Sequence, residues 1–275
     1  MKEYTFGFIG CGNMGGALAR AIAKSVKGAS LLLCDANAEK AELLAGEIGG
    51  ASLSLEEVVG KSDYLFLGVK PQTLPTLFDV LKPMLDARKT PPVLVSMAAG
   101  VSLATLSEYA GGEVPVIRIM PTLPVAVGEG VILYTANAGV NGEMLSDFCQ
   151  ALAKAGVTDY IEEDKIDAAS ALSGCGPAFV YLFADALADG AVACGLSREK
   201  ALLYASQTLA GAAEMLMTTG EHPATLKDAV CSPGGSTIEG VKALEEGAFR
   251  ATTMQAVMAS YEKTLMLGGR TKGAQ

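Results

Sequence analysis

The sequence has little of what metal and nucleic-acid sites require. It contains a single histidine, and its six cysteines form no CxxC pair, so the usual zinc patterns are absent and we expect reduced, structural thiols. Its 21 basic residues against 30 acidic ones give a formal net charge of -9, which argues against a nucleic-acid surface and against docking on anionic lipid. Residues 1–8 lead straight into a predicted strand without a secretory signal, which predicts a cytoplasmic protein. A small-molecule partner is the class that this composition favours.

The mean hydropathy of +0.35 raises the question of a membrane span. The most apolar helical window, residues 178–196, is long enough, but it contains Asp185 and Asp189. Two carboxylates in mid-span are costly in hydrocarbon, whereas closely spaced Ala and Leu suit helices that pack on other helices. The window therefore predicts a buried helix between subunits and no membrane contact.

Short apolar runs alternate with helical stretches through the first half of the chain. This rhythm predicts βαβ units, with a parallel sheet and helices on both of its faces. The predicted strands are 4–10, 30–34, 64–69, 93–97, 114–120 and 131–134. After about residue 160 the strands stop, and Ala, Leu, Met and Glu dominate. We therefore expect a doubly wound α/β domain over 1–160 and an all-helical domain over 161–275.

A GxGxxG motif follows the first predicted strand and opens a helical run. Glycines in this place allow a tight turn and a close approach of the backbone to a pyrophosphate, whose charge meets the helix N-terminus. The alternative is a glycine turn with only a structural role. The motif consists of Gly10, Cys11, Gly12, Asn13, Met14 and Gly15.

The choice of nucleotide depends on Asp35, at the end of the second predicted strand. It follows Gly15 by 20 positions (35 minus 15), where an acidic residue usually binds the ribose. A carboxylate there accepts from the 2′-hydroxyl of NADH and repels a 2′-phosphate, so the prediction leans to NADH. Lys40, the nearest cation in the sequence, keeps NADPH open. The alternative is that Asp35 is the N-cap of the following helix.

Ordered motifs along essentially the whole chain resemble the pyrroline-5-carboxylate reductases. The last piece is the family's signature region and is highly specific. The pieces are FIGCGNMGGA at the start, VKPQ at 69–72, SMAAGV at 96–101, RIMP at 118–121, LSGCGPAF at 172–179 and LKDAVCSPGGSTIEG at 226–240.

The resemblance implies an N-terminal Rossmann-type domain and a C-terminal helical dimerisation domain. It implies hydride transfer from NADPH or NADH to the C=N carbon of 1-pyrroline-5-carboxylate, which gives L-proline. Because a cyclic imine is reduced most readily as its iminium ion, such an enzyme needs an anchor for the carboxylate and a polar group at the ring nitrogen. Family members form homodimers, and a decamer is the larger assembly that the resemblance allows.

The resemblance also assigns site residues. Ser232, Gly235, Ser236 and Thr237 would hold the substrate carboxylate, Thr237 would contact the ring nitrogen as the catalytic candidate, and Glu163 would be a further substrate contact. Two loops at the carboxyl ends of strands would line the cofactor. They are Val69, Lys70 and Pro71 in one and Ala98, Ala99 and Gly100 in the other.

One departure from the family pattern and several alternatives stand beside this interpretation. Thr122 replaces a common asparagine, which loses one hydrogen-bonding arm, and Lys70 could be a solvated surface lysine. His222 lies in a turn between helices, with nothing nearby in the sequence to orient it for acid catalysis. The alternative functions are another cyclic-imine reductase, a β-hydroxyacid-type dehydrogenase, or a nucleotide sensor without activity.

Overall fold

Two compact units make up the chain in the computed structural model, which describes residues 4–112 and 114–268. The first unit consists of two segments of the chain, one that ends at Gly174 and one that begins at Ser260. The second unit is Cys175–Ala259. The first unit therefore includes helix α7 (Glu163–Ser173) and the last part of α12 (Phe249–Leu267), which the sequence division at 160 had placed in the helical domain.

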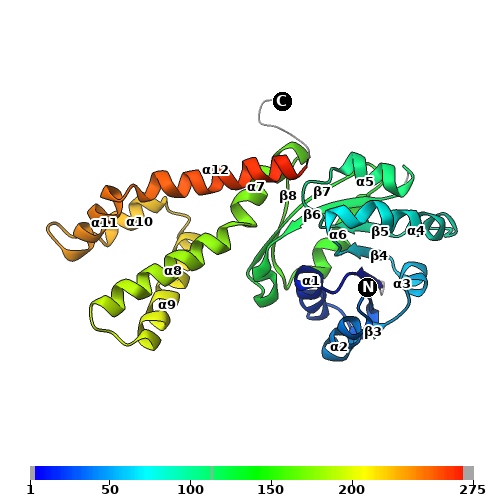
Figure 1. Ribbon diagram of the computed structural model, residues 1–275, viewed down its shortest axis with the longest axis horizontal. Helices are drawn as coiled ribbons and strands as arrows, with labels where there is room; N and C mark the ends of the chain where they lie inside the picture. The colour runs from blue at the N-terminus through cyan, green and yellow to red at the C-terminus, as the bar shows by residue number, and fades with distance from the viewer. Residues whose placement is uncertain (1–3, 113, 269–275) are drawn as a thin grey trace. The chain divides into compact units, whose positions relative to one another are not determined.

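A single eight-stranded sheet forms the centre of the first unit (Figure 1). Its strand order is β3-β2-β1-β4-β5-β6-β7-β8, so the order reverses between β1 and β4, as in doubly wound folds. All six strands that the sequence predicts are present. The strands are β1 (Phe6–Ile9), β2 (Leu31–Cys34), β3 (Ala51–Ser52), β4 (Tyr64–Leu67), β5 (Val93–Ser96), β6 (Val116–Pro121), β7 (Gly130–Ala136) and β8 (Gly156–Tyr160).

The sheet is mixed, so the expectation of a purely parallel sheet is wrong at β7. This strand runs antiparallel to β6, and β8 runs parallel to β7. Only the short helix η3 (Leu123–Val127) lies between β6 and β7, whereas a parallel crossover needs a dozen or more residues. Two further strands were not predicted: β3, which has only two residues, and β8, a partly exposed edge strand.

Helices cover both faces of the sheet and enclose two apolar cores. Neighbouring residues of one strand serve different cores: Phe66 joins the first core, while Leu65 and Leu67 join the second. The first core takes side chains from α1 (Asn13–Ala23), α2 (Ala38–Ile48) and α6 (Gly142–Ala151), and the second from α3 (Leu55–Lys61), α4 (Leu74–Asp86) and α5 (Leu103–Ala110). The doubly wound class that the sequence predicts is confirmed.

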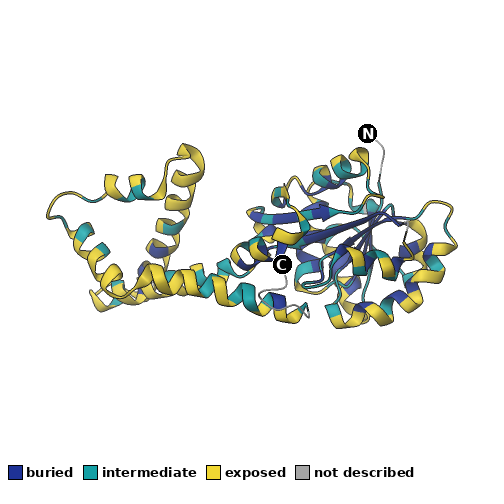
Figure 2. Cartoon of the chain, turned by 90° about the horizontal axis from the view of Figure 1, so that it is seen from above, coloured by how far each residue is buried: buried dark blue, intermediate teal, exposed yellow. Residues whose placement is uncertain are grey.

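The second unit is helical, and most of its residues are exposed to solvent in the single chain (Figure 2). Its buried residues are few and small: Ala188 packs with Ala201 and Ala205 where α8 and α9 meet. Exposed leucines are frequent, and Leu182 is 73% accessible. The elements are α8 (Gly176–Ala193), α9 (Arg198–Thr219), α10 (Pro223–Ala229), α11 (Ser236–Glu246) and the first part of α12.

One helical stretch, Glu163–Ala193, is long and apolar enough to cross a membrane by length and composition alone. Its most apolar window has a mean hydropathy of 1.4, and 11% of that window is buried. The stretch divides between α7 and α8, and its second half carries Asp185 and Asp189. An apolar face on a helix also suits a subunit interface, so this feature is weak support for a membrane span.

Candidate active site

The glycine turn between β1 and α1 has the geometry that a pyrophosphate needs. Gly10 has φ +99, and a Cβ there would lie 2.6 Å from the Gly68 carbonyl oxygen. A Cβ on Gly15 would lie 2.1 Å from the Gly10 carbonyl oxygen, so neither position accepts a side chain. A Cβ on Gly12 would meet nothing within 4 Å. Two glycines are thus required by the turn itself, while the third leaves open space beside the backbone.

Helix α1 begins without a side-chain cap, which leaves its first N–H groups available for an anion. Its N-cap residue is Gly12, which has no side chain to accept a hydrogen bond from the first turn. Among the described helices, six others carry side-chain caps: Asn37 for α2, Ser54 for α3, Ser102 for α5, Asn141 for α6, Ser197 for α9 and His222 for α10. Free N–H groups and the helix dipole together favour a phosphate at the start of α1.

Asp35 joins this turn to the end of β2. Its Oδ2 accepts a hydrogen bond from the Cys11 backbone N–H at 2.7 Å, and its Oδ1 accepts from the Asn37 backbone N–H at 2.9 Å. The N-cap of α2 is Asn37, whose Oδ1 accepts from Glu39 N–H. The alternative of Asp35 as a helix cap is therefore wrong. A carboxylate has about four acceptor positions, so Asp35 retains capacity for a ribose hydroxyl.

Arg20 is a neighbour of the turn that the sequence analysis missed. A Cβ on Gly16 would lie 3.1 Å from Arg20 Nη1. Both carboxylate oxygens of Glu47 accept from this guanidinium, at 2.7 and 2.6 Å, so its charge is already paired. Arg20 lies near the turn because it follows Gly16 by four positions on α1, whereas its pairing with Glu47, 27 positions away on α2, depends on how the two helices pack.

The two predicted cofactor loops follow β4 and β5, which are neighbouring parallel strands, so both loops lie at the carboxyl edge of the sheet. Lys70 is exposed at the start of the short helix η2 (Pro71–Thr73). Ala98 is buried, and its N–H donates to Ser96 Oγ at 3.4 Å. Gly100 has φ +77, and a Cβ there would lie 3.1 Å from Gly268 Cα. The predicted cofactor residues are thus all placed at this edge, within the first unit.

Glu163 lies at the start of α7 and takes part in a network of charges. Its Oε1 accepts from the Leu103 backbone N–H at 2.5 Å and from Arg118 Nη1 at 3.4 Å. Arg118 is fully buried on β6, and its Nη2 donates to Asp167 Oδ1 at 2.7 Å. Thr122 is also engaged, because its Oγ1 accepts from Val131 N–H at 2.9 Å.

The predicted carboxylate site is a turn in the second unit, ahead of α11. Gly234 has φ +65, and a Cβ on Gly235 would lie 2.3 Å from Ser232 Oγ. Gly235 is the N-cap of α11, and no side chain caps this helix. Three exposed hydroxyls, on Ser232, Ser236 and Thr237, therefore surround the free N–H groups of a helix start. Such a site suits a small carboxylate.

His222 has a local structural task. Its Nδ1 accepts a hydrogen bond from the Ala224 backbone N–H at 3.2 Å, so the imidazole caps α10. Histidine is an unusual N-cap residue, so this role could not be predicted from the residue type. In the described part of the chain, no group of three or more His, Cys, Asp or Glu residues could hold a metal ion.

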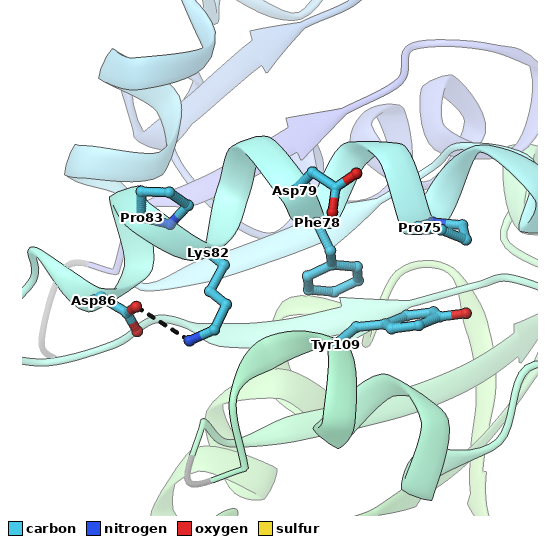
Figure 3. A pocket seen from close by; sticks show the side chains of 7 residues that line it. All are labelled: Pro75, Phe78, Asp79, Lys82, Pro83, Asp86 and Tyr109. Carbon is cyan, nitrogen blue, oxygen red and sulfur yellow. Dashed lines mark hydrogen bonds and ion pairs between the residues drawn. The ribbon is translucent and has the colours of Figure 1, made fainter.

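A cleft of about 390 Å³ between α4 and α5 lies apart from these residues (Figure 3). Phe78 and Tyr109 face each other there with ring centroids 5.6 Å apart, and Lys82 pairs with Asp86 at 3.1 Å. None of the predicted site residues lines this cleft. Its chemistry gives no reason to place the active site there.

The fold, the glycine turn and the edge loops define a nicotinamide-dependent oxidoreductase. Two family profiles agree: residues 5–100 match "NADP oxidoreductase coenzyme F420-dependent", and residues 163–267 match "Pyrroline-5-carboxylate reductase dimerisation". The chain belongs to the pyrroline-5-carboxylate reductase family, because relatives of that name are 41% and 37% identical to it over nearly the full length of both chains.

Full-length relatives carry this assignment. The chain is 41% identical over 266 residues to pyrroline-5-carboxylate reductase of Glycine max, and the match covers 96% of each protein. It is 37% identical over 265 residues to the enzyme of the same name from Escherichia coli, and this match covers 95% of this chain and 97% of the relative. A crystal structure of the Plasmodium falciparum pyrroline carboxylate reductase with NADP bound aligns at a TM-score of 0.87 with 34% identity, over 98% of this chain and 99% of that one. These relatives do not favour a β-hydroxyacid-type dehydrogenase.

Proposed function

We propose that this protein reduces 1-pyrroline-5-carboxylate to L-proline with a reduced nicotinamide cofactor. The observation that carries the proposal is the turn before α11, where three exposed hydroxyls surround an uncapped helix start. Relatives that match this chain over nearly their whole length are named pyrroline-5-carboxylate reductase, after this reaction. A nucleotide sensor would need the glycine turn at α1 but would have no use for this second anion site.

In the proposed reaction, the bound cofactor supplies a hydride for the C=N carbon. Ser232, Gly235 and Ser236 hold the substrate carboxylate through hydroxyl and backbone N–H groups, where the dipole of α11 stabilises negative charge. Thr237 orients the ring nitrogen by a hydrogen bond. An ordinary hydroxyl is a poor acid, so the proton on nitrogen arrives with the iminium form of the substrate or from water. One hydride and one proton convert C=N to CH–NH.

The direct test is oxidation of NADH or NADPH on addition of 1-pyrroline-5-carboxylate. We expect turnover with at least one cofactor and proline as the product. Tight cofactor binding without turnover would instead identify a sensor.

Thr237→Ala tests the proposed catalytic residue. Loss of a hydrogen bond to a charged group costs about 1.5–3 kcal/mol, so kcat/KM should fall by about tenfold or more while the protein stays folded. Thr237→Ser, which keeps the hydroxyl, should recover most of the activity. Equal kcat/KM in wild type and Thr237→Ala would remove Thr237 from the mechanism.

We also propose a preference for NADH, because the Asp35 charge at the glycine turn opposes a 2′-phosphate. Asp35→Ser and Asp35→Asn should both raise kcat/KM for NADPH relative to NADH. Asp35→Asn is the closer control, since its amide oxygen still accepts one of the two backbone hydrogen bonds. An unchanged ratio in both variants would limit Asp35 to holding the turn.

We propose a homodimer formed through the helical unit, with a decamer as a larger assembly, and a cytoplasmic location. Residues 163–267 match a dimerisation profile, and a groove of about 400 Å³ between α8 and α12 is lined mainly by apolar side chains. A second copy of the chain would cover this surface.

A further inference from the structure

We propose that Arg118 and Glu163 are positioning residues for the reduction, which hold the 98–100 loop where the nicotinamide cofactor requires it. The inference rests on the proposed role of this loop in cofactor binding. It gives Glu163 a different task from the substrate contact that the resemblance implied.

Arg118 fastens helix α7 to the sheet from inside the first unit. Its side chain is fully buried, and its two terminal nitrogens reach different carboxylates of α7: Nη2 donates to Asp167 at 2.7 Å and Nη1 to Glu163 at 3.4 Å. A buried charge is costly to leave without a partner, and in the described part of the chain these two carboxylates pair with the terminal nitrogens of Arg118, while its Nε has no hydrogen-bond partner. The fork of the arginine therefore sets where the Glu163 carboxylate lies.

Glu163 in turn caps helix α5, which follows the 98–100 loop. Leu103 is the first residue of α5, and its N–H donates to Glu163 Oε1 at 2.5 Å. The local cap, Ser102, accepts from Thr105 N–H at 3.1 Å, so the two side chains serve different donors of the same helix start. A carboxylate at a helix N-terminus is favoured by the dipole.

The loop is held on three sides as a result. Ser96 Oγ accepts from Ala98 N–H before the loop, and Glu163 accepts from Leu103 N–H after it. Gly100 packs so closely on Gly268 that a Cβ would lie 3.1 Å from its Cα. Of these three contacts, only the one through Glu163 depends on a charged side chain. The Glu163 side chain is 34% exposed, so it can be substituted without collapse of the core.

The test measures cofactor binding apart from turnover. Dissociation constants for NADPH and NADH are determined by fluorescence titration of the full chain without substrate, followed by KM for 1-pyrroline-5-carboxylate. Glu163→Ala should raise the cofactor dissociation constant by about fivefold, which corresponds to about 1 kcal/mol. The KM for the imine should change by less than about twofold, because the loop and not the carboxylate turn has moved.

Two conservative variants test the successive contacts from Arg118 through Glu163 to the start of α5. Glu163→Gln keeps an oxygen that can accept from Leu103 N–H and should recover part of the affinity. Arg118→Lys keeps a charge for Asp167 but cannot reach both carboxylates, so it should weaken cofactor binding in the same direction as Glu163→Ala.

Asn141→Ala is the matched control. Asn141 caps α6 by accepting from Met144 N–H at 3.0 Å, and α6 follows the antiparallel strand β7, so this cap lies at the opposite edge of the sheet. Its loss should lower thermal stability without changing cofactor affinity. The proposal is overturned if Glu163→Ala binds both cofactors as Asn141→Ala does, or if it raises only the KM for the imine.

A variant within the loop separates this inference from the proposed site. Ala99→Glu places a carboxylate directly on the loop and should weaken binding of both cofactors. If it does so and Glu163→Ala does not, the positioning role fails and the proposed site stands. If Ala99→Glu leaves affinity unchanged, the loop does not bind the cofactor, and both fail.

Discussion

Cys11 occupies a position in the glycine turn where a reactive thiol would endanger the nucleotide site. Burial, together with the nearby Asp35 and Cys34, raises the pKa of this thiol to about 12. Its Sγ donates to the Cys34 carbonyl oxygen at 3.7 Å. The thiolate is the nucleophilic form, so Cys11 is protected from alkylation near neutral pH.

We therefore expect iodoacetamide at pH 8 to modify the exposed Cys194 long before Cys11. Peptide mass spectrometry over a time course provides the measurement. Equal labelling of the two cysteines would show that the turn opens readily in solution. Bound NADH or NADPH should slow any residual reaction at Cys11 and leave Cys194 unaffected.

Single residues divide into those that the sequence could assign and those that only folding reveals. The glycines of the first turn were predictable because their spacing is local. Asn37 and His222 were not recognised as helix caps, since Asp35, two positions before Asn37, is an equally common type of cap residue and histidine is a rare one. The partners of Arg118 are 45 and 49 positions away in the chain, so no local pattern points to them.

At the scale of elements, the turn from β1 into α1 contains some glycines that the fold requires and one that matters only for cofactor binding. Gly12 has φ -69, which alanine adopts freely, and a Cβ there meets nothing within 4 Å. Gly12→Ala should therefore keep the melting temperature and raise the cofactor dissociation constant by about tenfold, since the new methyl group occupies the approach to the pyrophosphate.

Gly15→Ala is the contrasting change. Its Cβ would lie 2.1 Å from the Gly10 carbonyl oxygen, so the turn has to distort, and we expect a loss of about 1–3 kcal/mol in the free energy of unfolding. Calorimetry on both variants checks the pair. A destabilised Gly12→Ala with normal cofactor affinity would contradict this division of roles.

Elements were predictable where their pattern was strong. The six central strands are short apolar runs and were all expected, whereas β8 has the sequence GVTDY and lies at a partly exposed edge. The direction of β7 was not predicted, although the eight residues between β6 and β7 (122–129) already exclude a crossover helix. Loop length was the available signal.

At the scale of the whole molecule, the exposed apolar surface of the second unit leads to a test of assembly. Leu182 lies in the groove between α8 and α12 and is 73% exposed in the single chain. Burial of a leucine contributes about 1.5–3 kcal/mol, and a two-fold interface uses each residue twice, so Leu182→Asp should raise the dimer dissociation constant by about a hundredfold or more.

Leu43→Asp is the control for this experiment, because Leu43 is similarly exposed, at 68%, but lies on α2 of the first unit. Sedimentation of diluted protein should show monomers for Leu182→Asp and the wild-type assembly for Leu43→Asp. Equal sedimentation of the two variants would place the interface elsewhere.

The first compact unit is completed only when the chain returns to it at Ser260, where Leu265 is buried. During synthesis, the nucleotide-binding unit is therefore still missing a piece of its packing after the whole helical unit, Cys175–Ala259, has left the ribosome. Prematurely terminated chains would expose that unfilled place, and cellular proteases could distinguish them from finished enzyme before any of them competes for cofactor.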